Sequence, residues 1–175
     1  MNPRTRPLAV EDAARLADLV QTHRAFMAPW EPDREESWFT VDGQRAMIER
    51  LLEDQQRGAA CLHVILDDDG SVVGRVNLNN IVRGPFLSCH LGYWVAESAN
   101  GRGLATEAVR ELVGFGFTEL GLHRVQAGTL LHNVASQKVL HRNGFARFGL
   151  APAYLRIAGR WQDHYLYQLL NPALP

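Results

Sequence analysis

The stretch GYWVAESANGRGLATEA, residues 92–108, decides how the rest of the chain is interpreted. Residues 92–95 end an apolar strand, and residues 100–105 lead directly into a helix. Gly101 and Gly103 let the backbone turn sharply and direct several N–H groups into one concavity at the helix N-terminus. Such a concavity, together with the helix dipole, is an anion site that suits a pyrophosphate, and Arg102 would add positive charge. Taken alone, an ordinary glycine turn before a helix explains the segment more simply.

The spacing of apolar residues predicts helices and strands on both sides of this stretch. We expect helices over residues 11–23, 42–57, 104–120 and 134–142, and an ordered loop with short helical turns over 26–40. We expect strands over residues 7–10, 61–66, 72–82, 86–95, 123–131, from 144 onward, and over 163–170. Three antiparallel candidates stand in the middle of this order, which favours a mixed sheet with helices packed on it, an α+β fold, over a doubly wound parallel sheet.

The composition is that of one ordinary domain, residues 1–175, without a linker or a repeat. The formal net charge of -1 predicts no general binding to nucleic acid or membranes, and such a contact would need a local basic patch. Residues 1–10 lack the apolar run of a signal peptide, so we expect a cytoplasmic protein. Cys61 and Cys89 lie in apolar stretches without metal-ligand spacing; we expect two buried free thiols and no metal.

A second polar segment, HNVAS at residues 132–136, opens the helix predicted at 134–142. Asn133 can cap this helix by accepting from a free backbone N–H group. Ser136 lies one turn later on nearly the same face, so the two polar side chains could meet one ligand. A capped helix with an incidental serine is the alternative.

Together, the two segments resemble those of the GNAT acetyltransferases. In that family a loop of the form [Q/R]-x-x-G-x-[G/A] binds the pyrophosphate of acetyl-CoA, and a later helix carries N-x-x-[A/S] and ends near G-F. Here the loop is NGRGLA and the helix is HNVASQKVLHRNGF, and Asn100 replaces the usual Gln or Arg. Four further stretches are similar to the RimJ/RimL branch, on its RimJ side: FMAPWEPDREES (26–37), NNIVRGPF (79–86), LGYWV (91–95) and YLRIAGRWQDH (154–164).

The resemblance implies a GNAT fold: a seven-stranded mixed sheet flanked by about four helices and splayed between two central parallel strands. It implies that acetyl-CoA is the cosubstrate and that acetyl passes by direct attack to the N-terminal α-amine of a protein, with a ribosomal protein that has Ala or Ser first as the implied acceptor. A homodimer is a further implication. The implied cofactor-binding residues are Tyr93, Trp94, Val95, Asn100, Gly101, Arg102, Gly103, Leu104, Ala105, Thr106, Asn133 and Ser136.

The catalytic residues depart from the family in part. Many relatives protonate the leaving thiolate with a tyrosine, where this chain has Leu140, so the resemblance favours Ser136 as the donor to the thiol. His90 stands where many relatives have a glutamate and could take the amine proton directly or through water; a structural histidine on the sheet is the alternative. The glutamate that RimL-like enzymes use is replaced by Leu155. Trp30, Glu31, Arg83 and Tyr154 are expected on the acceptor side.

Two other functions stay open at this point. Within the superfamily, the acceptor could be a small amine, such as an amino acid, a polyamine or an aminoglycoside. In a different class, the chain could be a non-catalytic acyl-CoA-binding or ribosome-assembly factor, since the usual tyrosine and glutamate are missing. Another kind of nucleotide-binding module is less favoured because no phosphate-binding lysine follows the glycines.

Overall fold

The computed structural model describes residues 3–174 and shows one seven-stranded sheet in the order β1-β2-β3-β4-β5-β7-β6. The ends of the predicted 1–175 domain, residues 1, 2 and 175, lie outside the described residues. The strands are β1 (Thr5–Pro7), β2 (Cys61–Leu66), β3 (Val72–Val82), β4 (Ser88–Val95), β5 (Arg124–Leu130), β6 (Ala146–Ile157) and β7 (Arg160–Leu170). All neighbouring strands are antiparallel except β4 and β5. The predicted mixed sheet is therefore confirmed.

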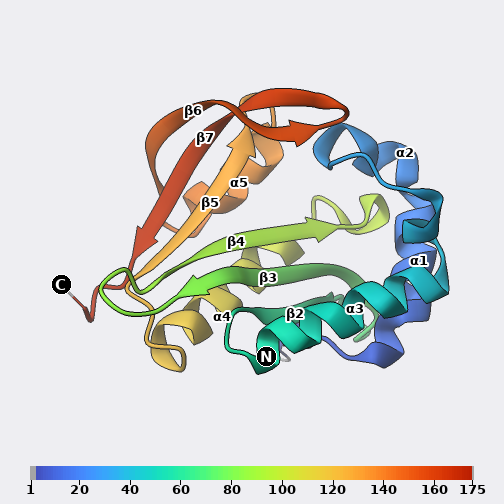
Figure 1. Cartoon of the computed structure of the whole chain (residues 1–175), viewed down its shortest axis with the longest axis horizontal. Coiled ribbons are helices and arrows are strands. Elements are labelled where there is room, and N and C mark those ends of the chain that lie inside the picture. The colour runs from blue at the N-terminus through green and yellow to red at the C-terminus, as the bar shows by residue number, and fades with distance from the viewer. Residues whose placement is uncertain (1–2, 175) are drawn as a thin grey trace.

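Helices cover both faces of this sheet (Figure 1). The α-helices are α1 (Ala13–Thr22), α2 (Arg24–Met27), α3 (Val41–Gln56), α4 (Leu104–Thr118) and α5 (Val134–Arg142). On one face, α4 and α5 bury an apolar core with the inward residues of β2 to β5. On the other face, α1 and α3 pack over β2 and the start of β3. The fold is the expected α+β arrangement, with five α-helices in place of about four because α2 adds one short turn.

The sheet opens between its two central strands. β4 and β5 pair in parallel over three residues only, from Ser88 opposite Arg124 to His90 opposite Gln126. Beyond this point β4 stays paired with β3 and β5 stays paired with β7, so the two strands diverge (Figure 1). The splay expected between the central strands is thus present, and it begins directly after His90.

The first and the last strand differ most from the sequence-based prediction. The first strand ends at Pro7 instead of starting there, because Asp12 accepts from the Ala9 N–H group at 3.0 Å and folds residues 10–12 into a 3₁₀ turn. The last strand starts at Arg160, three residues earlier than predicted, because it forms a long hairpin with β6. A glycine with a positive φ of 74°, Gly159, makes the turn between them.

Candidate functional site

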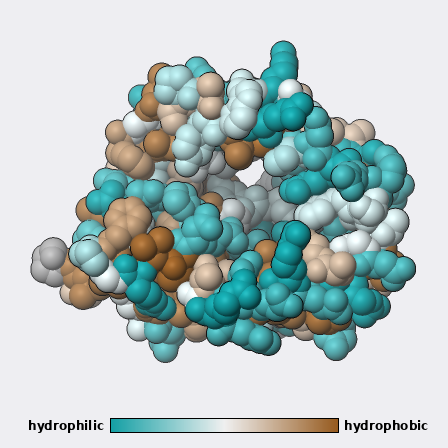
Figure 2. Space-filling view, in the orientation of Figure 1, coloured by the Kyte–Doolittle hydropathy of each residue, from teal (hydrophilic) through white to brown (hydrophobic). Residues whose placement is uncertain are grey.

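A cavity of about 680 Å³ lies in the opening between β4 and β5. This volume is within the range of small-molecule sites. Figure 2 shows the molecule hollowed at this place, between the β6–β7 hairpin and the helices of the N-terminal half. The structure brings together ten of the predicted site residues in its lining: Trp30, Glu31, Tyr93, Trp94, Val95, Asn100, Gly101, Ala105, Asn133 and Ser136.

A smaller cavity, of about 220 Å³, continues from it to the N-terminus of α4. Gly101 and Gly103 hold this end of the cavity in left-handed backbone, with φ of 76° and 83°. A Cβ atom on either glycine would meet no atom within 4 Å, so the loop faces open space. The first N–H groups of an α-helix have no partner within the helix. The loop therefore fits a diphosphate group, as the sequence predicted, and Lys138 and Arg142 of α5 line the same space.

Arg102 does not face either cavity. Its guanidinium donates to Asp68 in the β2–β3 turn at 2.7 Å, and Arg4 donates to the same carboxylate at 2.7 Å. Arg4 also pairs with Glu107 in the first turn of α4, at 2.5 Å. The expectation that the Arg102 side chain adds charge beside the pyrophosphate is therefore corrected: it fastens the glycine loop to the β2–β3 turn instead.

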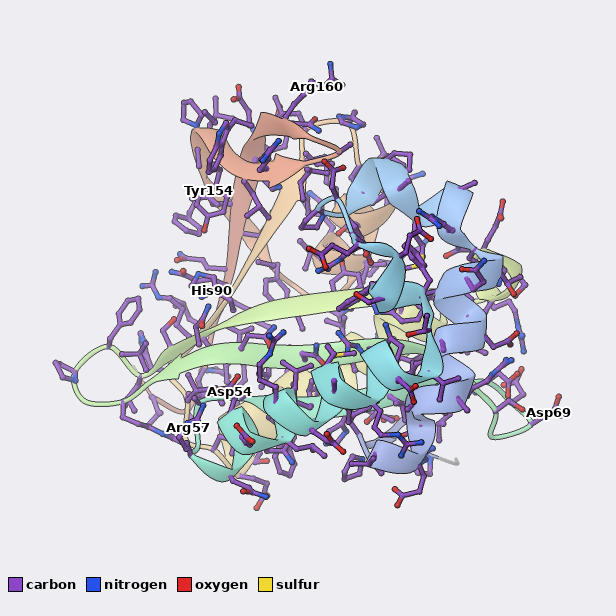
Figure 3. All side chains as sticks on the ribbon, turned by 45° about the vertical axis from the view of Figure 1, so that its right-hand side comes forward. Asp54, Arg57, Asp69, His90, Tyr154 and Arg160 are labelled. Atoms are coloured by element: carbon purple, nitrogen blue, oxygen red, sulfur yellow. The ribbon has the colours of Figure 1, made fainter. Side chains whose placement is uncertain are left out.

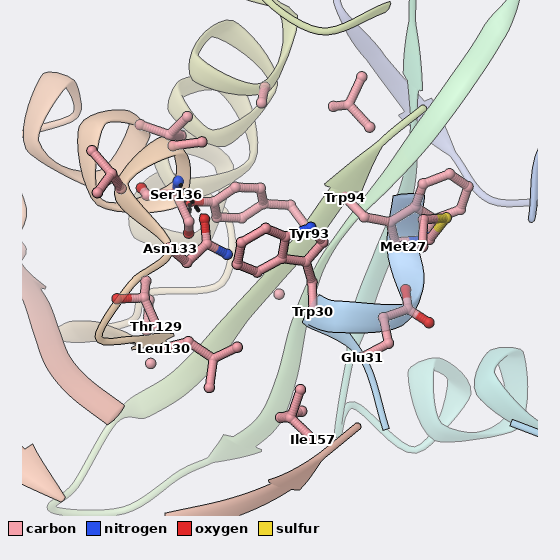
Figure 4. Close-up of a pocket in the computed structure, with 18 of the residues that line it drawn as sticks. Met27, Trp30, Glu31, Tyr93, Trp94, Thr129, Leu130, Asn133, Ser136 and Ile157 are labelled. Atoms are coloured by element: carbon pink, nitrogen blue, oxygen red, sulfur yellow. Dashed lines mark hydrogen bonds between the residues drawn. The ribbon is translucent and has the colours of Figure 1, made fainter. Parts of the chain in front are cut away.

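Ser136 and Tyr93 form a hydrogen-bonded pair on the wall of the larger cavity (Figure 4). Their hydroxyl oxygens are 2.8 Å apart, and the Tyr93 hydroxyl also lies 3.2 Å from the Ser136 carbonyl oxygen. Asn133 caps α5 as predicted, accepting from the Ser136 N–H group at 3.0 Å. Burial raises the pKa of the Tyr93 phenol, so it stays protonated. Leu140, at the position of the family's tyrosine, is buried in the core.

The pairing of Tyr93 with Ser136 is a feature that sequence reasoning missed. Tyr93 was expected only to bind the cofactor. A period of two along β4 places Tyr93 on the same face as Leu91 and Val95, which pack toward α4 and α5. That alternation could have placed the phenol beside the start of α5.

Trp30 and Glu31 close the acceptor side of the cavity. The Trp30 ring stacks on His132, with ring centroids 5.4 Å apart. The Glu31 carbonyl oxygen accepts from the Ala158 N–H group in the β6–β7 turn at 3.0 Å. These two contacts join the loop after α2 to the β5–β7–β6 side of the opening. His132 was not predicted at the site, because a single sequence gives no sign of a contact made across the fold.

The side chain of Glu31 lines the cavity and is largely buried. Burial raises its pKa above the usual value, and the Arg34 guanidinium, 3.5 Å away, opposes that shift. A carboxylate whose pKa is raised toward neutrality is suited to accept a proton from an amine.

Besides Arg102, three predicted residues lie outside the lining of both cavities. His90 is the last residue of β4 that pairs with β5, below the cavity, and its Nδ1 is buried without a hydrogen-bond partner. Arg83 follows β3 at the far end of the sheet and donates to the Leu120 carbonyl oxygen. Tyr154 stacks near His164, with ring centroids 5.5 Å apart, and is otherwise exposed. Figure 3 shows Tyr154 on the hairpin and His90 on β4 beneath it. Direct contact of His90 or Arg83 with a bound amine is thus not supported.

The family assignment follows from comparison with known proteins. The Acetyltransferase (GNAT) domain matches residues 4–146. The chain belongs to the GNAT acetyltransferase family. Its family and its relatives, which include N-acetyltransferases, show that the chain is an acyltransferase.

Named relatives fall in the RimJ/RimL branch. The GNAT chain is 37% identical to the [Ribosomal protein uS5]-alanine N-acetyltransferase of Escherichia coli, over 92% of this chain and 84% of the relative. The crystal structure of ribosomal-protein-S5-alanine acetyltransferase from Vibrio fischeri has a TM-score of 0.92 and 32% identity, covering 98% of this chain and 94% of that one. Mycobacterium smegmatis RimJ in complex with CoA-disulfide has the same score and identity, with 98% and 83% coverage.

Two negative findings apply to residues 3–174. In this part of the chain no three or more His, Cys, Asp or Glu side chains are grouped so that they could hold a metal ion. None of the helices described there combines the length and apolarity needed to cross a membrane.

Proposed function

We propose that this chain transfers the acetyl group of acetyl-CoA to the N-terminal α-amine of a protein in the cytoplasm, with a ribosomal protein that begins with Ala or Ser as the acceptor. The observation that carries the proposal is the cavity between β4 and β5, which runs from the glycine loop at α4 to the wall formed by Trp30 and Glu31. Relatives named as ribosomal-protein N-acetyltransferases, one of them solved with CoA-disulfide, support the same acceptor and cosubstrate.

In this proposal the glycine loop holds the diphosphate of acetyl-CoA. Residues 103–106 line the smaller cavity at the N-terminus of α4, where the unpaired N–H groups of the first helical turn and the helix dipole favour an anion. Lys138 and Arg142 add positive charge from α5. The unpaired edge of β4 after His90 offers backbone groups to the pantetheine, and N–H groups near Val95 can polarise the thioester carbonyl.

Ser136 is the proposed proton donor to the departing thiolate. The amine nitrogen bonds to the carbonyl carbon, the carbon–sulfur bond breaks, and Ser136 gives its proton to the sulfur. The new amide nitrogen loses its extra proton to water in the open cavity, and water returns a proton to Ser136. Because Tyr93 stays neutral, its single proton can turn from the Ser136 carbonyl oxygen, to which the phenol donates at 3.2 Å, to the Ser136 hydroxyl oxygen at 2.8 Å. The serine proton is then free to face the cavity. Tyr93 acts in this scheme as a positioning residue.

Glu31 is the proposed acceptor of the amine proton. An ammonium group has no lone pair, so the α-amine must lose a proton before it can attack. Glu31 lines the cavity and has a raised pKa, whereas His90 lies below it and could act only through water. The structure therefore favours Glu31 over the histidine suggested by the sequence, and Trp30 supplies an apolar wall for the first side chain of the acceptor.

A protein acceptor has more support than the other functions considered. The relatives reported above are named for proteins, and nothing comparable favours a small amine or a non-catalytic factor. The homodimer stays a prediction.

The test is acetyl-CoA turnover with a panel of acceptors: peptides that begin with Ala, Ser, Met or Asp, matched with free amino acids and polyamines. The proposal predicts turnover on Ala-first or Ser-first peptides and much slower turnover on the small amines. Faster turnover on a small amine, or binding of acetyl-CoA without turnover on any peptide, would overturn it.

A further inference from the structure

Charge is distributed unevenly along this chain. Residues 1–120 contain 12 Arg and 18 Asp or Glu, whereas residues 121–175 contain six Lys or Arg and a single acidic residue, Asp163. The two parts therefore carry formal charges of -6 and +5 at neutral pH. The second part forms β5, α5, β6 and β7, which lie together at one end of the sheet (Figure 1). A total charge near zero thus hides a basic C-terminal unit.

The basic side chains of this unit are not neutralised by carboxylates. Seven arginines among residues 3–120 form ion pairs with Asp or Glu. Between residues 121 and 174 no Lys or Arg does so. Lys138 and Arg142 line the smaller cavity and are assigned to the cosubstrate. Arg147, Arg156 and Arg160 of the β6–β7 hairpin remain exposed and have no part in the reaction.

Two of these arginines lie beside aromatic rings on one face of the hairpin. The Arg147 guanidinium is 4.4 Å from the centroid of the Tyr165 ring. Arg156 stands directly opposite Trp161 in the β6–β7 ladder, and Trp161 is 66% exposed. Trp161 and Tyr165 are four residues apart on β7, so they share a face and lie about 13 Å from each other. Asp163 lies between them on this face, where its carboxylate accepts from the Ala153 N–H group at 2.8 Å, and Tyr165 is partly buried against the core. Along the upper rim of Figure 2, over this hairpin, hydrophilic and hydrophobic residues alternate.

We propose that this surface, the hairpin face formed by Arg147, Arg156, Trp161 and Tyr165, binds single-stranded RNA. Arginines attract the phosphates, and an exposed aromatic ring stacks on an unpaired base. An acidic protein segment would pair with the arginines but would leave Trp161 exposed, and a duplex would hide its bases from that ring. The choice of RNA over DNA rests on the proposed function, because a ribosomal-protein acceptor has RNA as its neighbour. The hairpin residues that line the cavity, Leu155, Ile157 and His164, lie on the other face of the hairpin, so bound RNA would lie behind this wall of the acceptor side.

The test is fluorescence anisotropy of a labelled oligouridylate of about twelve nucleotides with the full chain. With Arg147 and Arg156 each neutralising one phosphate, the logarithm of affinity should fall with the logarithm of salt concentration with a slope of about -1.4. Arg156→Ala should reduce that slope by about 0.7. Trp161→Ala should weaken binding at least about fivefold, since a stacked base is lost. Arg50→Ala, an exposed arginine of α3, is the matched control and should bind as the unmodified protein does.

Two further arms locate the site and identify the ligand. Binding should persist with saturating CoA, and loss of binding would place the RNA in the cosubstrate cavity and overturn the proposal. Polyglutamate that binds as tightly as the RNA would also overturn it, as would equal affinity of the Trp161→Ala and Arg50→Ala variants. Peptide turnover by Arg156→Ala should be unchanged, so a failed RNA assay leaves the acetyltransferase proposal separately testable.

Discussion

Replacing Tyr93 by Phe tests the pair that the structure forms with Ser136. The change keeps the ring and removes the hydroxyl, which lies 2.8 Å from the Ser136 hydroxyl oxygen and 3.2 Å from its carbonyl oxygen. The net contribution of one such hydrogen bond to the stability of an arrangement is about 0.5–1.5 kcal/mol. If that contribution acts on the transition state by orienting the serine, kcat should fall between about twofold and about tenfold. KM for acetyl-CoA should change little, because the ring and the β4 backbone remain.

A double-mutant cycle shows whether Tyr93 acts through Ser136. A positioned proton donor contributes about 10² to 10⁴ in rate, so Ser136→Ala should lower kcat by at least about 10². The double variant Tyr93→Phe with Ser136→Ala should then be no slower than Ser136→Ala alone, because nothing remains to be oriented. The assay is steady-state release of CoA thiol with an Ala-first peptide, with calorimetry of acetyl-CoA binding for each variant.

Two results would refute this reasoning. If Tyr93→Phe slows the double variant by the same factor as it slows the unmodified protein, the two hydroxyls act independently. If Ser136→Ala turns over normally, the serine has no part in proton transfer. The raised pKa of Tyr93 gives a further check. Ionisation of this phenol should cause no change in kcat at any pH below about 10, the usual pKa of a tyrosine.

Three other predictions follow from the site and the core. Because burial raises the pKa of Glu31, kcat/KM should fall as the pH decreases through a pKa above that of an ordinary glutamate. Glu31→Gln should lower kcat/KM and remove this acidic limb of the pH–rate profile. An acidic limb that is unchanged in the variant would exclude Glu31 as the base. Gly103→Val should lose acetyl-CoA binding by calorimetry and about 1–3 kcal/mol of stability, because Gly103 has a φ of 83°; normal affinity would contradict the loop assignment. Burial raises the pKa of Cys61 to about 11 and that of Cys89 to about 12, so a thiol reagent at neutral pH should modify both only after unfolding.

The features predicted best from the sequence are those encoded locally. The glycines before α4 and the Asn133 cap of α5 depend on backbone conformation and on a neighbour three residues away, and both appear as expected. The splay between β4 and β5 was anticipated through the resemblance, since no local pattern encodes where two strands separate.

The features missed depend on contacts between distant segments. Trp30 stacks on His132 and Tyr93 bonds to Ser136, pairs that are separated by 102 and 43 positions along the chain. Arg102 was expected to face the pyrophosphate, but the nearby Asp68 of another turn binds it instead. The basic C-terminal unit can be found in the sequence alone, but the total charge of -1 does not show it, because the acidic residues before residue 121 offset it.

Mass-spectrometric mapping of the acetylated position shows whether the α-amine is the group that receives the acetyl. A peptide that begins with Ala and contains an internal lysine would be incubated with acetyl-CoA and the protein, alongside the same peptide with a blocked α-amine. The account predicts one acetyl group, on the α-amine of the free peptide, and none on the blocked one. Acetylation of the lysine side chain in both peptides, or of neither peptide, would contradict it.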